Sequence, residues 1–232
     1  MRTGTRILIT ALFVAGVPQV WAAASGPSSG GSSMPDMSPS RAQTPEDKAK
    51  SVYNSGVRTV NKADKYDAAA EKATDARKKD KASAEAQEQY KSALGKFEQA
   101  VQYAPAMYEA WNYVGYTHRK LGDYDQALTA YDHALALKPS YPEAIEYRGE
   151  AYLRMKRFDD AKQAYLDLFA GNRALADKLL GAMKTWLATQ VGAGADAASV
   201  EELTKWVQER SQIAGQTAAL TREGTSAGAS WR

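Results

Sequence analysis

The amino-acid sequence predicts an all-α fold, a helical solenoid of about three hairpins that is closed by a C-terminal helical cap. Two observations predict it. Residues recur at a fixed spacing of 34 along the middle of the chain, which is typical of stacked structural repeats. No segment shows a sustained alternation of β-branched and polar residues bounded by turn signals, so no sheet is expected. Helices must therefore form the core, and each hairpin must bury its apolar face against the next.

The 34-residue period is carried by pairs of chemically similar residues. The pairs are Ala110 and Ala144, Tyr113 and Tyr147, Gly115 and Gly149, Lys120 and Arg154, Tyr124 and Phe158, Ala127 and Ala161, and Tyr131 and Tyr165. Upstream, the same spacing places Tyr90, Ala93, Phe97, Ala100 and Pro105 before Tyr124, Ala127, Tyr131, Ala134 and Pro139. Gly115 and Ala127 lack bulk where two helices would cross, which allows their backbones to approach closely. Gly122 and Pro139 end successive helices.

Residues 108–141 resemble the tetratricopeptide repeat (TPR) family most closely. The positions that match its pattern are Trp111, Val114, Gly115, Leu121, Gly122, Tyr124, Ala127, Tyr131, Ala134 and Pro139, while His118 replaces the usual Tyr. The resemblance implies two antiparallel helices per repeat, with the first helix of each pair lining a concave surface that binds a protein or peptide partner. The chain is thus expected to be an exported bacterial member of this family.

The repeat domain is expected to span residues 45–172. Thr44, Pro45 and Glu46 form a helix start, and repeats 108–141 and 142–172 follow a degenerate first hairpin within 45–107. In that hairpin the first helix would carry Tyr53 and Gly56. The second would be an extended helix from about Tyr66 to Tyr103, with two short helices broken near Lys81 as the alternative. Two amphipathic stretches in 173–215 predict the cap, joined through Gly192 and Gly194, and residues 216–232 are expected to be disordered.

The beginning of the chain predicts export. Residues 1–24 combine Arg2 and Arg6, an apolar run over 7–17 and three alanines at 22–24, which is typical of a cleaved signal peptide. The run is too short for a membrane-spanning helix, which needs roughly 20 residues. Cleavage after Ala22 or Ala24 would leave a Ser, Gly and Pro-rich flexible linker over 25–44 and a periplasmic or secreted protein with no integral membrane segment.

Composition argues against several other functions. Two of the 30 Lys and Arg residues lie in residues 1–24, which hold no acid, so cleavage leaves 28 basic and 27 acidic residues. Nucleic-acid binding normally needs a strong basic surplus, so none is expected. There is no Cys, and the two histidines, His118 and His133, have no evident catalytic partner. His118 is expected to pack between helices. No cofactor, metal site or catalytic residue is predicted, and a His118-dependent hydrolase is the enzymatic alternative.

Two sets of residues are expected to line the partner-binding groove, because a spacing of three and four within each set places its members on one helix face. Their residues are Glu109, Asn112, Tyr113, Tyr116, Arg119 and Lys120 in the first repeat, and Glu143, Glu146, Tyr147, Glu150 and Arg154 in the second. Tyrosines ringed by charges suit protein recognition, and the three glutamates favour a basic or mixed ligand over a carboxylate. The expected function is a non-enzymatic scaffold or adaptor. A chaperone-like holder of unfolded clients and a self-associating structural protein, such as a homodimer, are the alternatives.

Overall fold

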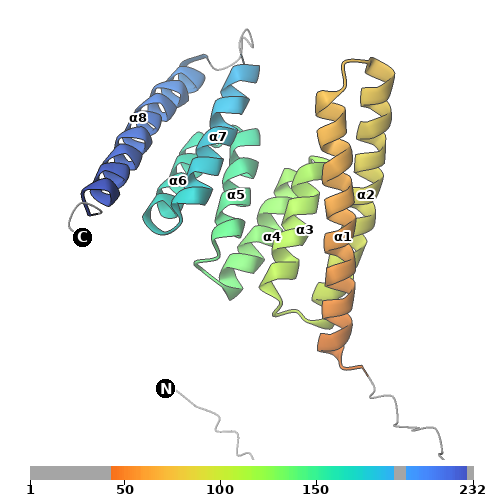
Figure 1. Cartoon of the computed structure of the whole chain (residues 1–232). Coiled ribbons are helices and arrows are strands. Elements are labelled where there is room, and N and C mark those ends of the chain that lie inside the picture. The colour runs from red at the N-terminus through yellow and green to blue at the C-terminus, as the bar shows by residue number, and fades with distance from the viewer. Residues whose placement is uncertain (1–42, 191–196, 229–232) are drawn as a thin grey trace, which may run out of the picture. The chain divides into compact units, whose positions relative to one another are not determined.

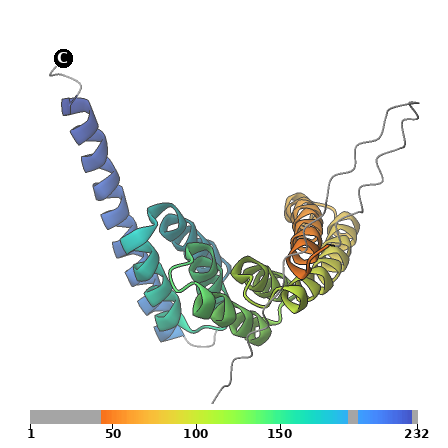
Figure 2. The ribbon, with the colours of Figure 1, turned by 90° about the horizontal axis from the view of Figure 1, so that it is seen from below.

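The computed structural model describes residues 43–190 and 197–228, which form eight α-helices and no strand. The helices are α1 (Pro45–Lys72), α2 (Ala76–Tyr103), α3 (Tyr108–Leu121), α4 (Tyr124–Leu137), α5 (Pro142–Arg154), α6 (Phe158–Gly171), α7 (Arg173–Thr189) and α8 (Ala197–Gly228) (Figure 1). The pairs α1 with α2, α3 with α4 and α5 with α6 pack as successive hairpins, which Figure 2 shows from below. The predicted all-α fold of TPR-like hairpins is confirmed.

Small residues set the closest helix contacts, as the repeat pattern predicts. A Cβ placed on Gly115 of α3 would lie 2.5 Å from Tyr131 Cε1 of α4, and one on Gly56 of α1 would lie 2.6 Å from Phe97 Cε1 of α2. Tyr131 and Phe97 are fully buried. In both hairpins the aromatic ring of the second helix therefore fills the space that the missing side chain of the first helix leaves.

The first hairpin differs from its prediction. Helix α1 begins at the expected place, where Thr44 and Asp47 form a reciprocal capping box, but it continues without a break to Lys72. The single helix expected from Tyr66 to Tyr103 was wrong, because residues 73–75 separate α1 from α2. The break also lies before Lys81, since the Asp75 side chain accepts a hydrogen bond from the Lys78 N–H at 2.9 Å and starts α2 there.

Alanines explain how α1 and α2 pack against each other. Ala63 and Ala70 of α1 and Ala86 and Ala93 of α2 are at most 5 % exposed. Rows of small side chains let the two 28-residue helices approach along their length, so the hairpin needs few large apolar anchors. The charged residues 77–81 near the start of α2 are exposed.

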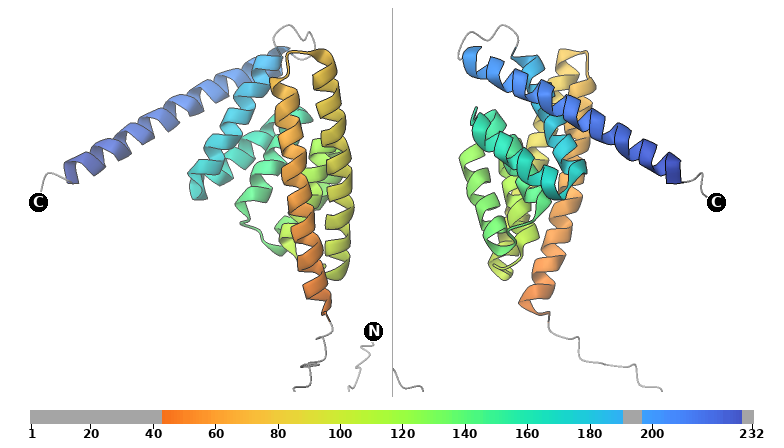
Figure 3. Two further views of the ribbon diagram at one scale, coloured as in Figure 1. Left: turned by 45° about the vertical axis from the view of Figure 1, so that its right-hand side comes forward. Right: turned by 90° about the vertical axis from the view of Figure 1, so that its left-hand side faces the viewer.

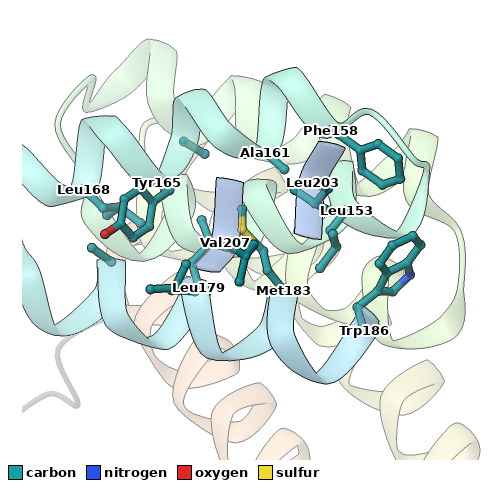
Figure 4. Packing of buried hydrophobic residues seen from close by; sticks show 13 residues of the cluster. Leu153, Phe158, Ala161, Tyr165, Leu168, Leu179, Met183, Trp186, Leu203 and Val207 are labelled. Carbon is teal, nitrogen blue, oxygen red and sulfur yellow. The ribbon is translucent and has the colours of Figure 1, made fainter. Parts of the chain in front are cut away.

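The C-terminal helices close the core of the last hairpin. Leu179, Met183 and Trp186 of α7 and Leu203 and Val207 of α8 are buried against α6 (Figure 4). The buried surface of α6 would otherwise face solvent, which is why a terminal repeat needs a cap.

Helix α8 is longer than the sequence predicts. It runs to Gly228, and its C-terminal end lies away from the other helices in both views of Figure 3. The expected stop before Gly215 and the expected disorder from residue 216 were therefore wrong up to residue 228. A Cβ on Gly215 would meet no atom within 4 Å, so this glycine marks no close contact, and a single glycine costs a helix only about 1 kcal/mol.

Three predicted features fall outside the described residues: the signal peptide, the linker up to residue 42, and the connection through Gly192 and Gly194. Among the helices that the structure does describe, none has both the length and the apolar content to cross a membrane.

Candidate functional site: the tyrosine face

The odd-numbered helices form one layer of the repeat domain. Helix α1 contacts α3, α3 contacts α5, and α5 contacts α7, while α2, α4 and α6 each pack against these helices as hairpin partners. Every residue that sequence analysis assigns to the groove belongs to α3 or α5. The predicted residues are therefore all carried by one layer.

Four tyrosines of this layer lie in a row, which we call the tyrosine face: Tyr53 of α1, Tyr113 and Tyr116 of α3, and Tyr147 of α5. The ring centroids of Tyr53 and Tyr113 are 5.6 Å apart, those of Tyr113 and Tyr116 6.1 Å, and those of Tyr116 and Tyr147 5.0 Å. All four side chains are partly exposed. Tyr53 was predicted to lie in the first helix but not in the groove, because the first hairpin does not keep the 34-residue period.

Arg119 of α3 holds the middle of the tyrosine face in place. Its guanidinium carbon lies 5.2 Å from the ring centroid of Tyr116 and 5.4 Å from that of Tyr147, within the range of a cation–π contact. The same group donates to the Glu150 carboxylate of α5 at 2.5 Å. Burial opposes ionisation of Glu150, but the Arg119 charge, a hydrogen bond with Glu146 and the charges of Lys178 and Lys120 together outweigh it and hold the pKa of Glu150 below its usual value.

Glu146 does not lie where the sequence predicts. It was expected to face a ligand, but its side chain is fully buried between α5 and α7, where Lys178 donates to it at 2.9 Å. Burial first, and then the neighbouring Glu150, raise the pKa of Glu146. Glu146 and Glu150 are thus occupied within the molecule and are not free to bind a basic ligand, so that part of the prediction was wrong. The helical period identified the face of α5 but not the helix that covers it.

Asn112 is also buried, with 2 % of its surface exposed, and its Oδ1 accepts no hydrogen bond from the described residues. Lys120 forms an ion pair with Asp67 of α1. Arg154 is exposed and lines a small cavity of about 190 Å³ together with Glu150 and Trp186. Of the eleven predicted residues, Asn112 and Glu146 are therefore withdrawn from the surface, and Arg154 lies beyond the tyrosine face.

Ion pairs connect each odd-numbered helix to the next. Lys120 joins α3 to α1, Arg119 joins α3 to α5, and Lys178 joins α7 to α5. Asp64 of α1 adds a further link, since it accepts hydrogen bonds from the Tyr116 hydroxyl at 2.7 Å and the Tyr90 hydroxyl at 2.6 Å. The charges on this layer consequently fix the positions of the tyrosines.

Both histidines line a cavity of about 500 Å³ between α2, α3 and α4. His133 stacks on Trp111 with ring centroids 4.5 Å apart, and His118 Nδ1 lies 3.5 Å from Asp123 Oδ2. His118 packs between helices as expected, with 15 % of its side chain exposed. Among the described residues, no three His, Cys, Asp or Glu side chains gather so as to hold a metal ion.

The fold and this face define an all-α array of helical hairpins with a preformed aromatic and charged surface on one layer. The family model described as TPR repeat matches residues 115–156, from α3 through α5. No curated protein gives a significant match to the chain.

Three solved structures are similar to the chain, with the following sequence identities, coverages and TM-scores. The first TPR of Spaghetti (RPAP3) bound to an HSP90 peptide is 18 % identical, covers 62 % of this chain and 97 % of that chain, and has a TM-score of 0.44. The CopN-Scc3 complex is 16 % identical, with 62 % and 78 % covered and a TM-score of 0.43. The TPR2B domain of yeast Sti1 in complex with pHsp70 is 16 % identical, with 70 % and 98 % covered and a TM-score of 0.37. These values assign no ligand to this chain.

Proposed function

We propose that the chain is a non-enzymatic scaffold or adaptor that binds a segment of a partner protein on the tyrosine face. One observation carries the proposal: four partly exposed tyrosines from three helices contact one another and are held by ion pairs between those helices. Tyr rings give a large contact area at a small entropic cost, and a surface that is already ordered loses less entropy on binding.

The surface is built for contact and not for bond cleavage. Arg119, Lys120 and Glu150 beside the tyrosines are taken up in ion pairs, and Glu146, the acid with the raised pKa, is fully buried against Lys178. A general acid must reach the proton-accepting group of a substrate within hydrogen-bond distance, which a fully buried carboxyl cannot do. The pairing of these groups therefore favours binding over catalysis.

The location that we propose is the periplasm or the extracellular space. It rests on the signal-peptide pattern of residues 1–24. Mass spectrometry of the protein expressed with its full N-terminus in a Gram-negative host tests it. The mature chain should begin at Ala23 or Ser25 in the periplasmic or culture fraction, and an uncleaved chain in the cytoplasm would contradict it.

Site-specific photo-crosslinking tests the binding proposal. A benzophenone side chain replaces Tyr113 on the tyrosine face or, as the control, Gln163, which is exposed on α6. After irradiation in cells, a discrete crosslinked product should form from position 113 and not from position 163. Products of equal yield from both positions, or none from position 113, would contradict the proposal.

A further inference from the structure

A second group of tyrosines lies at the N-terminal ends of α3 and α5. The ring centroids of Tyr108 and Tyr141 are 4.9 Å apart at 77°. The chain's own Lys138 ammonium lies 4.4 Å from the centroid of Tyr108 and 5.1 Å from that of Tyr141, and it donates to the Tyr108 hydroxyl at 3.0 Å. These rings thus already hold a cation over their faces, as the electrostatics of aromatic rings favours.

Two carboxylates border these rings without a partner of their own. Glu109 follows Tyr108 in α3, and Glu143 follows Tyr141 and Pro142 in α5. Both are partly exposed, and neither forms an ion pair within 4.0 Å or a hydrogen bond with any residue that the structure describes, although both act on Lys138 through their charge. They differ in this respect from Glu146 and Glu150, whose charges are taken up by Lys178 and Arg119.

The same charges act on Tyr53, which joins this group to the tyrosine face. Burial and then Tyr113 and Glu109 raise the pKa of Tyr53, while burial, Glu143 and Tyr53 raise that of Tyr141. Among the described residues at this end of the tyrosine face, the two carboxylates exceed the ammonium of Lys138 by one charge, and Glu46 and Lys50, which line a cavity with Glu109, cancel each other.

Helix geometry explains the two acids of this arrangement but not the tyrosines. An acid in the first turn of a helix is favoured by the helix dipole, which accounts for Glu109 and Glu143 as residue types. It does not account for three partly exposed tyrosines beside them. A cation in contact with such rings gains from their negative faces, and unpaired carboxylates nearby add a Coulomb attraction.

We infer that the end of the tyrosine face formed by Tyr53, Tyr108, Tyr141, Glu109 and Glu143 binds a lysine or arginine side chain of the partner segment. The inference rests on the proposed function and adds the chemistry of the ligand. A cationic side chain would bring the local charge to zero and contact the ring of Tyr53 and the faces of Tyr108 and Tyr141 that Lys138 does not cover. Acid-terminated segments would be disfavoured at the same position.

A defined probe tests the inference without the natural partner. The probe is the peptide acetyl-Gly-Ser-Lys-Ser-Gly-amide, and its control is the same peptide with Nε-acetyl-lysine. Titration into protein with ¹³C-labelled tyrosine rings should shift the Tyr53 and Tyr141 resonances with the lysine peptide. The acetylated peptide should have no comparable effect, because it lacks the charge. Equal shifts with both peptides would overturn the inference.

Charge-neutralised variants complete the test. The double variant Glu109→Gln, Glu143→Gln should lower the affinity for the lysine peptide about tenfold. This factor corresponds to the Coulomb attraction of two carboxylates across a wet surface. Asp125→Asn is the matched control, since Asp125 is the second residue of α4 just as Glu109 and Glu143 are the second residues of α3 and α5. It should leave binding unchanged. Full binding by the double variant, with its helicity intact, would overturn the inference.

Failure of this inference can be distinguished from failure of the proposed function. If the peptide fails to bind while the crosslinker at Tyr113 captures a partner, the inference fails and the binding proposal stands. If the crosslinker captures none, the binding proposal fails by itself.

Discussion

Replacing Gly115 with alanine should destabilise the protein, although alanine is the better helix former. The new methyl would lie 2.5, 2.6 and 2.9 Å from three carbons of the Tyr131 ring, whereas ordinary contacts begin at 3.4 Å. The ring has to retreat by about 1 Å, and it is fully buried. A displacement of this size in a fully buried ring lies in the upper part of the overpacking range, about 2–3 kcal/mol, against a gain of about 1 kcal/mol in helix propensity. The expected net loss is about 1–2 kcal/mol.

Gly181 provides the matched control. It lies in the interior of α7, is exposed, and a Cβ there would meet no atom within 4 Å. Gly181→Ala should therefore stabilise the protein by up to about 1 kcal/mol. Urea unfolding followed by circular dichroism at 222 nm measures both variants. For Gly115→Ala the midpoint should fall by about 0.7 M at an unchanged slope of about 2 kcal/mol/M. A Gly115→Ala protein as stable as the wild type would refute the packing argument.

Two further predictions concern the buried charges. The raised pKa of Glu146 means that the folded state holds its proton more tightly than the unfolded state, so this contribution to stability is complete below the ordinary glutamate pKa of 4.5 and is lost as the pH rises above it. Glu146→Gln should therefore gain in urea stability relative to the wild type between pH 5 and pH 8, and a difference that does not change with pH would disprove the assignment. Arg119→Met leaves Glu150 without its partner and should cost about 2 kcal/mol, whereas Lys91→Met, at an exposed pair with Glu88, should cost less than about 0.5 kcal/mol in the same assay. Equal losses would show that the Arg119 pair is no stronger than a surface pair.

The sequence predicts the features that a single helix pair determines. Gly115 and Ala127 fall in the same hairpin, and their lack of bulk predicts the close crossing of α3 and α4, where Gly115 lies against the Tyr131 ring. Pro45 and Thr44 likewise specify the start of α1 through local capping. The alternation of helices and the cap formed by α7 follow from apolar periodicity in the same way.

Two of the missed features depend on more than one helix pair. Glu146 has the spacing of a surface residue on α5, and only the position of α7 buries it against Lys178. The partner of Lys120 is Asp67, which lies outside the 34-residue period. The α1 and α2 pairing relies on alanines, whose individual apolar signal is weak, so the sequence pattern left the break between the helices undefined.

Hydroxyl-radical footprinting of the tyrosines, with and without a crosslink-identified partner, tests the central claim most directly. Radicals oxidise tyrosine rings in proportion to their exposure, and mass spectrometry locates each modified residue. Binding on the tyrosine face predicts that oxidation of Tyr113 and Tyr147 falls on complex formation, while oxidation of Tyr124, which begins α4 in the other layer, stays the same. Protection of Tyr124 with Tyr113 and Tyr147 unchanged would place the partner elsewhere and contradict the account.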